Sequence, residues 1–318
     1  MNYHIVTYGC QMNLHESEKI AGILRSVGYE KEVPLEEADI IVFNTCCIRE
    51  NAENHAFGNI GALKKLKRQK KGLIIAVGGC MAQEPGKVKV LQEKFPFIDI
   101  IFGTHNLAEL ASLIERKKSE KRVVSLYEDR RETEDGAQPC RTSYPNAWVN
   151  ITYGCNNFCT YCIVPYVRGR EKSRSAAVIL DEVRGLVKEG YKEITLLGQN
   201  VNSYRDGDVD FPALLDMVAS VEGDFRLRFM TSHPKDFSAR LVAVMKKHDK
   251  ILNLLHLPAQ SGSTRILRLM NRRYTREEYL EKVALLKREI PEAEITTDLI
   301  VAFPTETEEE FEETLSLV

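Results

Sequence analysis

Short apolar runs alternate with amphipathic segments along almost the whole of the 318-residue chain, and this alternation limits the possible folds more than any other feature. In the first 118 residues the apolar runs lie at 4–8, 40–44, 73–79 and 98–103. Apolar residues at helical spacing occur between them, for example Ile20, Ile23 and Leu24. Continuous apolar strands separated by helices predict a parallel sheet covered on both faces. We therefore expect a doubly wound α/β domain over residues 1–118.

The alternation resumes after residue 145. Strands are expected at 148–152, 193–197, 226–231, 253–257 and 294–301, with helices at 176–188, 211–221, 238–247, 276–288 and 308–317. Five consecutive βα units predict a partial TIM-like barrel over residues 146–318. A barrel that stops after five units exposes a strand edge, so we expect it to be incomplete at its C-terminal end. Residues 119–145 are charged and end among prolines, and we interpret them as a linker with one short strand at 123–126.

Composition narrows the class of protein. No apolar run reaches the length of a membrane span, and the first residues lack the pattern of a signal peptide. We therefore expect a cytoplasmic protein with reduced thiols, in which eight cysteines favour metal binding or catalysis over disulfides. The formal net charge of −2 means that a nucleic-acid surface, if present, is a local patch.

Three cysteines, Cys155, Cys159 and Cys162, follow the first expected barrel strand with the spacing C-x3-C-x2-C. Three thiolates can hold three irons of a cubane cluster and leave the fourth iron open to a substrate. Structural zinc is the alternative, but it needs a fourth ligand, and no histidine lies between His105 and His233. Several polar residues end the other barrel strands: Gln199, Asn200, Asn202, Ser232, His233, Gln260 and Ser261.

A second set of three cysteines lies in the first domain. Cys10, Cys46 and Cys80 each follow an expected strand. In a flavodoxin-like order the first strand lies between the second and third, so the three strand ends meet at one crevice. The alternative is that each is an ordinary buried cysteine. We expect Cys47 to point away from Cys46, because neighbouring side chains of extended chain alternate, and assign no role to Cys47 or Cys140.

Four motifs together resemble one known family. They are YGCQMN (8–13), NTCCIRENAE (44–53), GGCMAQ (78–83) and GCNNFCTYCIVPYVRGRE (154–171). In this order they are similar to the radical S-adenosylmethionine methylthiotransferases, and most similar to the MiaB branch, which modifies tRNA. The family has Gly-Phe-Pro-Gly-Glu-Thr where this chain has Ala302 to Thr307, with Thr305 in place of the second glycine. The family also continues with more barrel and a small RNA-binding domain called TRAM.

The resemblance implies two 4Fe-4S clusters and S-adenosylmethionine (SAM) as cofactors. Cys155, Cys159 and Cys162 match the ligands of the radical cluster, and Cys10, Cys46 and Cys80 match those of an auxiliary cluster that holds the sulfur. The implied reaction adds a 2-methylthio group to N6-isopentenyladenosine beside the anticodon. We expect Tyr161, Gln199 and Gln260 to contact SAM.

The implied partner is a tRNA that carries the isopentenylated adenosine, with a monomeric protein and no membrane. Candidate RNA-binding residues are Arg168, Arg170 and Arg174, which follow the second cysteine motif. Two alternatives stay open. One is a sister methylthiotransferase that acts on another modified adenosine or on a ribosomal-protein aspartate. The other is a non-catalytic iron–sulfur module that binds RNA.

Overall fold

The computed structural model describes residues 1–47, 50–127 and 138–318. The chain forms two compact units. The first contains residues 1–142 together with a short segment, 163–170, and the second contains residues 143–162 and 171–318. Each unit has its own hydrophobic core.

The first unit is built on a six-stranded sheet in which every pairing is parallel. Its strands, in spatial order, are β2 (Lys31–Glu32), β1 (Asn2–Thr7), β3 (Ile40–Thr45), β4 (Ile74–Gly79), β5 (Ile100–Phe102) and β6 (Val123–Ser125). The order 2-1-3-4-5-6 is flavodoxin-like and confirms the predicted doubly wound fold.

One detail of the predicted order was wrong. The two-residue strand β2 is exposed and polar, so no apolar run indicates it, and the prediction took β3 for the second strand. In the structure β3 lies between β1 and β4, with Thr7 beside Asn44 and Thr45 beside Gly79. The ends of these three strands are still neighbours at one edge of the sheet.

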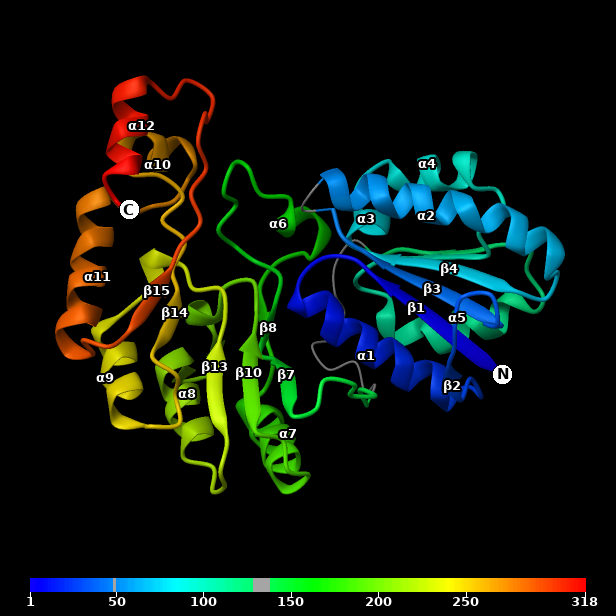
Figure 1. Cartoon of the computed structure of the whole chain (residues 1–318), viewed down its shortest axis with the longest axis horizontal. Coiled ribbons are helices and arrows are strands. Elements are labelled where there is room, and N and C mark those ends of the chain that lie inside the picture. The colour runs from blue at the N-terminus through cyan, green and yellow to red at the C-terminus, as the bar shows by residue number, and fades with distance from the viewer. Residues whose placement is uncertain (48–49, 128–137) are drawn as a thin grey trace. The chain divides into compact units, whose positions relative to one another are not determined.

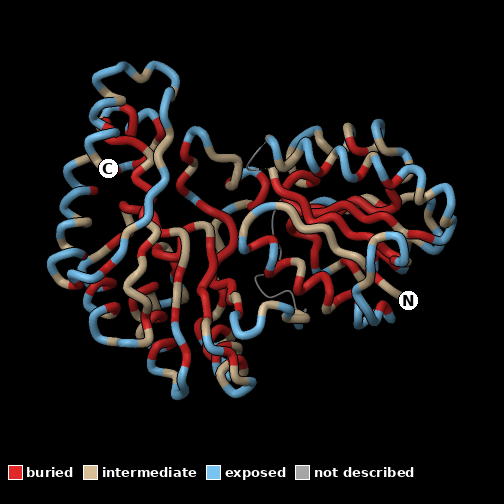
Figure 2. Tube along the Cα trace, in the orientation of Figure 1, coloured by how far each residue is buried: buried red, intermediate tan, exposed pale blue. Residues whose placement is uncertain are grey.

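Helices cover both faces of this sheet, as Figure 1 shows. On one face lie α1 (Gln11–Ser26) and α5 (Leu110–Lys117), and on the other lie α2 (Glu50–Gln69), α3 (Cys80–Gln83) and α4 (Lys87–Lys94). The central strands are buried along nearly their whole length (Figure 2), which explains their continuous apolar sequences.

The expected linker, 119–145, is in large part joined to the first unit. Strand β6 extends the sheet by pairing with β5. After residues 128–137, which lie outside the described residues, the chain returns to helix α1: the Cys140 backbone N–H donates to the Glu18 carbonyl at 2.8 Å, and that of Thr142 donates to Glu18 Oε1 at 3.1 Å. Strand β6 matches the short strand expected at 123–126, and its pairing attaches this part of the linker to the sheet.

The second unit contains all five expected βα repeats. A parallel sheet is formed by β13 (Arg226–Phe229), β10 (Glu193–Leu197) and β7 (Asn146–Asn150), and β14 (Leu254–His256) pairs in parallel with β15 (Glu294–Thr296). The repeats' helices are α7 (Ala176–Lys188), α8 (Phe211–Ala219), α9 (Ala239–Lys247), α11 (Arg276–Glu289) and α12 (Glu308–Leu315). The partial barrel is therefore confirmed. A further helix, α10 (Thr264–Leu269), was not predicted.

Candidate metal centres

The N-terminal cysteine set lies at three adjacent strand ends. Cys10 is the N-cap of α1 just after β1, Cys46 follows β3, and Cys80 begins α3 directly after β4. Cys46 and Cys80 are buried, Cys10 is half-buried, and all three are free thiols. The strand pairing places them at one edge of the sheet, where open α/β sheets bind ligands.

The turn before Cys10 depends on a glycine. Gly9 has φ +115°, and a Cβ atom at this position would lie 2.8 Å from Cys46 Cβ and 3.0 Å from Cys46 Sγ. Only glycine combines this backbone angle with so close an approach. The Gly9–Cys10 turn therefore packs directly against Cys46, as a shared site requires.

The expectation that Cys47 points away from this set was wrong. The Cys47 thiol hydrogen-bonds to Cys80, and this bond and the Arg168 charge outweigh burial and lower the pKa of Cys80 to about 7. The same bond and burial raise the pKa of Cys47. Side chains alternate only in extended chain, and β3 ends at Thr45, so the rule does not apply at residues 46 and 47.

The barrel set lies in the loop that follows β8 (Thr152–Tyr153). Cys155 and Cys159 are buried and Cys162 is half-buried. The backbone N–H of Cys162 donates to the Cys159 carbonyl at 2.9 Å, which folds the last two cysteines into one turn.

A segment far along the chain holds this loop. Asn271 Nδ2 donates to the carbonyls of Asn157 and Phe158 at 2.9 and 3.1 Å. Thr160 donates its backbone N–H to the Met270 carbonyl at 3.2 Å. The loop conformation therefore depends on residues at the end of α10, which the sequence analysis did not single out.

Arg272 is the other residue that the sequence analysis missed. It is buried, and its Nη1 lies 3.6 Å from Cys159 Sγ. Its Nη2 donates to the Pro258 carbonyl at 2.8 Å and its Nε to Tyr274 Oη at 3.0 Å. Arg272 therefore places a fixed positive charge beside one of the three barrel sulfurs. The only sequence signal for Arg272 is the pair of arginines in the stretch MNRRYT (270–275). The other arginine, Arg273, bonds to Asn271 instead of a cysteine in the described part of the chain.

The donor atoms of both sets fit an iron–sulfur cluster. Each set consists of thiols alone, and thiolate is the ligand that such clusters use. Among residues 1–47, 50–127 and 138–318, no three cysteine, histidine, aspartate or glutamate side chains surround one point as ligands of a single ion do. A cubane cluster binds each cysteine through a different iron, so its ligands stand farther apart than those of one ion.

Buried polar atoms without hydrogen-bond partners gather at the carboxyl ends of the barrel strands. Within the described part of the chain they include both amide atoms of Asn150, Thr152 Oγ1, Asn200 Oδ1, Asn202 Nδ2 and His233 Nε2. Buried polar groups normally have partners, so these atoms indicate a polar ligand. Burial and the nearby Arg272 lower the pKa of His233 to about 2, so its imidazole is neutral at neutral pH.

Strand β8 and the residue that follows β10 approach closely at these strand ends. A Cβ atom at Gly198 would lie 2.2 Å from Thr152 Oγ1, so the glycine of LLGQN leaves room for that hydroxyl. The residues expected to contact SAM lie on the same unit. Gln199 is half-buried, Tyr161 is exposed, and Gln260 has a left-handed backbone, φ +69°, and forms an isolated bridge with Leu299. Their contact with SAM stays a prediction.

The three arginines expected to bind RNA have different surroundings. Arg168 is buried and ion-paired with Glu16 at 2.7 Å, within the first unit. Arg174 is buried and ion-paired with Glu182 at 2.8 Å. Neither presents its guanidinium to a partner, so for these two residues the expectation does not match the structure. Arg170 is exposed and remains a prediction.

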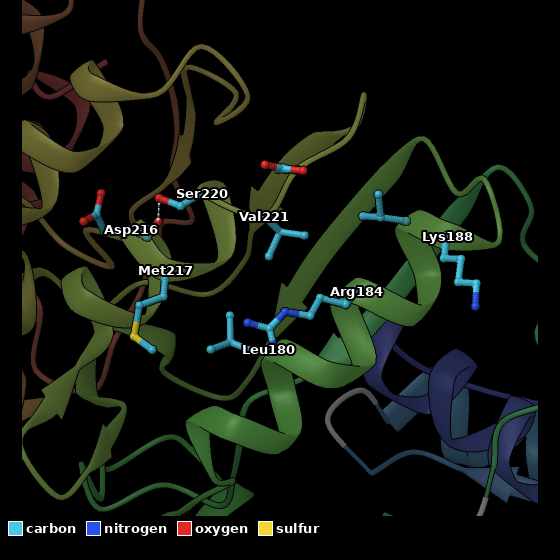
Figure 3. Close-up of a pocket in the computed structure, with 9 residues that line it drawn as sticks. Leu180, Arg184, Lys188, Asp216, Met217, Ser220 and Val221 are labelled. Carbon is cyan, nitrogen blue, oxygen red and sulfur yellow. Dashed lines mark hydrogen bonds between the residues drawn. The ribbon is translucent and has the colours of Figure 1, made fainter.

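A hollow of about 690 Å³ lies in the second unit (Figure 3). It is lined by α7 residues such as Leu180 and Arg184 and by α8 residues such as Asp216 and Met217. Its walls contain none of the cysteines or strand-end polar groups, so it is not a candidate for the chemistry.

Two family models match the chain. The Radical SAM superfamily matches residues 149–318, and an uncharacterized protein family, UPF0004, matches residues 2–103. Among curated relatives, the tRNA-2-methylthio-N(6)-dimethylallyladenosine synthase of Clostridium tetani is 53% identical, with 99% of this chain and 71% of the relative covered. The synthase of Carboxydothermus hydrogenoformans is 52% identical, with 100% and 73% covered.

Solved structures share the fold at low identity. The radical SAM methyltransferase TsrM from Kitasatospora setae, with cobalamin and a [4Fe-4S] cluster bound, has a TM-score of 0.71 and 14% identity, with 100% of this chain and 70% of that chain covered. The cobalamin-dependent radical enzyme OxsB has a TM-score of 0.67 and 12% identity, with 99% and 51% covered. None of the helices formed by the described residues has the length and apolar character of a bilayer span.

Proposed function

Since this chain belongs to the radical SAM methylthiotransferase family, we propose that it adds a 2-methylthio group to N6-isopentenyladenosine in tRNA. The observation that supports this most strongly is the identity of 52–53% over nearly the whole chain to synthases of that name. The two cysteine sets, which follow strand ends in the two units, would supply the thiolate ligands of the clusters that such a reaction needs.

The barrel set, Cys155, Cys159 and Cys162, would hold the radical 4Fe-4S cluster, and Cys10, Cys46 and Cys80 would hold the auxiliary one. When bound, the two clusters and SAM supply a 5′-deoxyadenosyl radical and a sulfur atom. The protein's own contribution is positioning. Asn271 and Thr160 fix the barrel loop, and the unpartnered atoms of Asn150 and Asn202 are available to the polar groups of SAM.

The substrate nucleoside can reach the carboxyl ends of the barrel strands because anticodon-loop bases are unpaired and can be splayed out. Arg170, which is exposed and follows the barrel cysteines, is the candidate phosphate contact. The reaction also needs an electron donor and a sulfur source, which are further partners. A thiol-based chemistry of this kind suits the reducing cytoplasm, and we infer a monomer acting there.

The test is the modified nucleoside itself. tRNA from cells that lack this protein should contain N6-isopentenyladenosine without the 2-methylthio group, and expression of the chain should restore the doubly modified nucleoside. Nucleoside mass analysis of digested bulk tRNA gives the answer. Unchanged tRNA together with loss of a modification on a ribosomal-protein aspartate would identify the sister activity instead.

A further inference from the structure

Arg168 and Glu16 form a buried charge pair beside the N-terminal cysteines. Arg168 Nη1 lies 2.7 Å from Glu16 Oε1, and Nη2 lies 3.2 Å from Glu16 Oε2, so the two planar groups bond in a fork. The exposed fractions are 5% for Arg168 and 6% for Glu16. A buried pair of this kind is weak evidence for stability, because desolvation offsets the attraction. It therefore calls for a functional explanation.

Shared contacts connect this pair to the cysteines. Asn13 Oδ1 accepts hydrogen bonds from Arg168 Nη2 at 3.2 Å and from Cys10 Sγ at 3.5 Å. Asn13 Nδ2 in turn donates to the carbonyl of Thr45, the residue before Cys46, at 3.0 Å. One asparagine thus joins the guanidinium to two strand ends that carry cysteines.

The third cysteine, Cys80, interacts with both charged side chains. Arg168 hydrogen-bonds to Cys80, and Glu16 lies within electrostatic range of the same thiol. Arg168 also interacts electrostatically with Cys10, in addition to Cys80 and Glu16. The two members of the pair therefore act on this cysteine set with opposite signs.

The segment that carries Arg168 is fixed in the first unit. Helix α6 (Val164–Val167) buries Pro165 and Val167, and Thr104 Oγ1 donates to the Val167 carbonyl at 2.5 Å. The chain thus leaves the barrel loop at Cys162 and, six residues later, brings a cation to the other cysteine set. In this position the Arg168 guanidinium is buried and paired with Glu16.

We propose that the Arg168–Glu16 pair sets the charge around the N-terminal cysteines and thereby controls how well this set holds its cluster and how easily that cluster is reduced. The inference rests on the proposed function, since it needs the auxiliary cluster. Arg168 and Glu16 are positioning residues that act through the cysteines. Buried charges and hydrogen bonds to sulfur are the means by which proteins tune such clusters.

The pair predicts shifts of opposite sign. Arg168→Met removes a cation and leaves Glu16 buried and unpaired beside three thiolates, so the cluster should be lost or become harder to reduce. Glu16→Gln removes the anion and keeps the arginine, so the cluster should be easier to reduce. The double variant removes both charges and should return toward the parent. Arg168→Lys keeps the positive charge but cannot form the two-point bond to Glu16, so it should restore part of the parent's iron content and midpoint potential.

The experiment uses the full chain with Cys155, Cys159 and Cys162 replaced by alanine, so that only the N-terminal set can load. After anaerobic reconstitution, this parent should contain about four irons per chain. Iron content and the midpoint potential from a reductive titration followed by electron paramagnetic resonance are measured for each variant. Arg141→Met is the matched control. The Arg141 side chain is also largely buried and pairs at 3.7 Å with Glu18, which lies on α1 as Glu16 does.

We expect Arg168→Met to lose iron by at least about 10-fold, or to keep it with a more negative midpoint. Glu16→Gln should keep iron with a more positive midpoint, and Arg141→Met should match the parent. The inference is overturned if Arg168→Met and Glu16→Gln leave both readouts unchanged, or shift the midpoint in the same direction. A parent that takes up no iron would instead contradict the proposed auxiliary cluster. If Arg168→Met does not fold, Glu16→Gln and the double variant decide.

Discussion

Replacing Cys159 with alanine should abolish the cleavage of SAM to 5′-deoxyadenosine. Cys159 is buried within the barrel loop, and Arg272 Nη1 lies 3.6 Å from its sulfur. Loss of an outer-shell partner of a metal ligand already costs about 10–100-fold in affinity or activity. Loss of a thiolate from a set of three should exceed that range, because the loop contains no fourth cysteine to replace it.

The measurement is 5′-deoxyadenosine released under anaerobic, reducing conditions by protein reconstituted with iron and sulfide. Cys140→Ala is the matched control, because Cys140 is a half-buried cysteine that belongs to neither set. Full cleavage by Cys159→Ala, with iron content equal to the control, would remove Cys159 from the ligand set.

Replacing Cys46 with alanine should separate the two activities. This variant keeps the barrel cysteines, so it should still cleave SAM. It should form no 2-methylthio product, because one of the three N-terminal thiolates is gone. Cys46 also packs on the Gly9 turn, but a change from a small thiol to alanine removes little volume and should leave the fold intact.

Cys47→Ala is the informative comparison for this prediction. The Cys47 thiol forms a hydrogen bond with Cys80, so Cys47 as well as Cys46 lies close enough to be the third ligand. The family resemblance assigns Cys46. We therefore expect Cys47→Ala to keep its iron and its methylthio product, measured together by iron analysis and nucleoside mass. Loss of both from Cys47→Ala, with Cys46→Ala active, would exchange the two assignments.

Much of the architecture could be predicted because burial leaves a direct trace in the sequence. Strands β3 and β4 are buried on both faces, so they read as continuous apolar runs. Strand β2 leaves no such trace, because its two residues are exposed and charged. The order of the sheet therefore came out with the wrong neighbour for β1, although the fold class was right.

The two cysteine sets could be predicted because the cysteines come shortly after apolar runs, and the order of the runs along the chain predicts which strand ends are neighbours. What could not be predicted were contacts between side chains far apart in sequence. Arg168 lies 152 residues from Glu16, and Arg272 lies 113 residues from Cys159. Near a cysteine motif an arginine suggests RNA binding, and only the structure shows that Arg168 is turned into the first unit.

The most direct measurement of the central claim counts both products in one reaction. The reconstituted protein is given SAM, a reductant and tRNA that carries N6-isopentenyladenosine, and 5′-deoxyadenosine and the 2-methylthio nucleoside are quantified together by mass spectrometry. We predict that both form in the parent and that neither forms in Cys159→Ala. We also predict that Cys46→Ala forms the first without the second. Release of 5′-deoxyadenosine by the parent without any methylthio nucleoside, when iron analysis shows both cysteine sets loaded, would contradict the account.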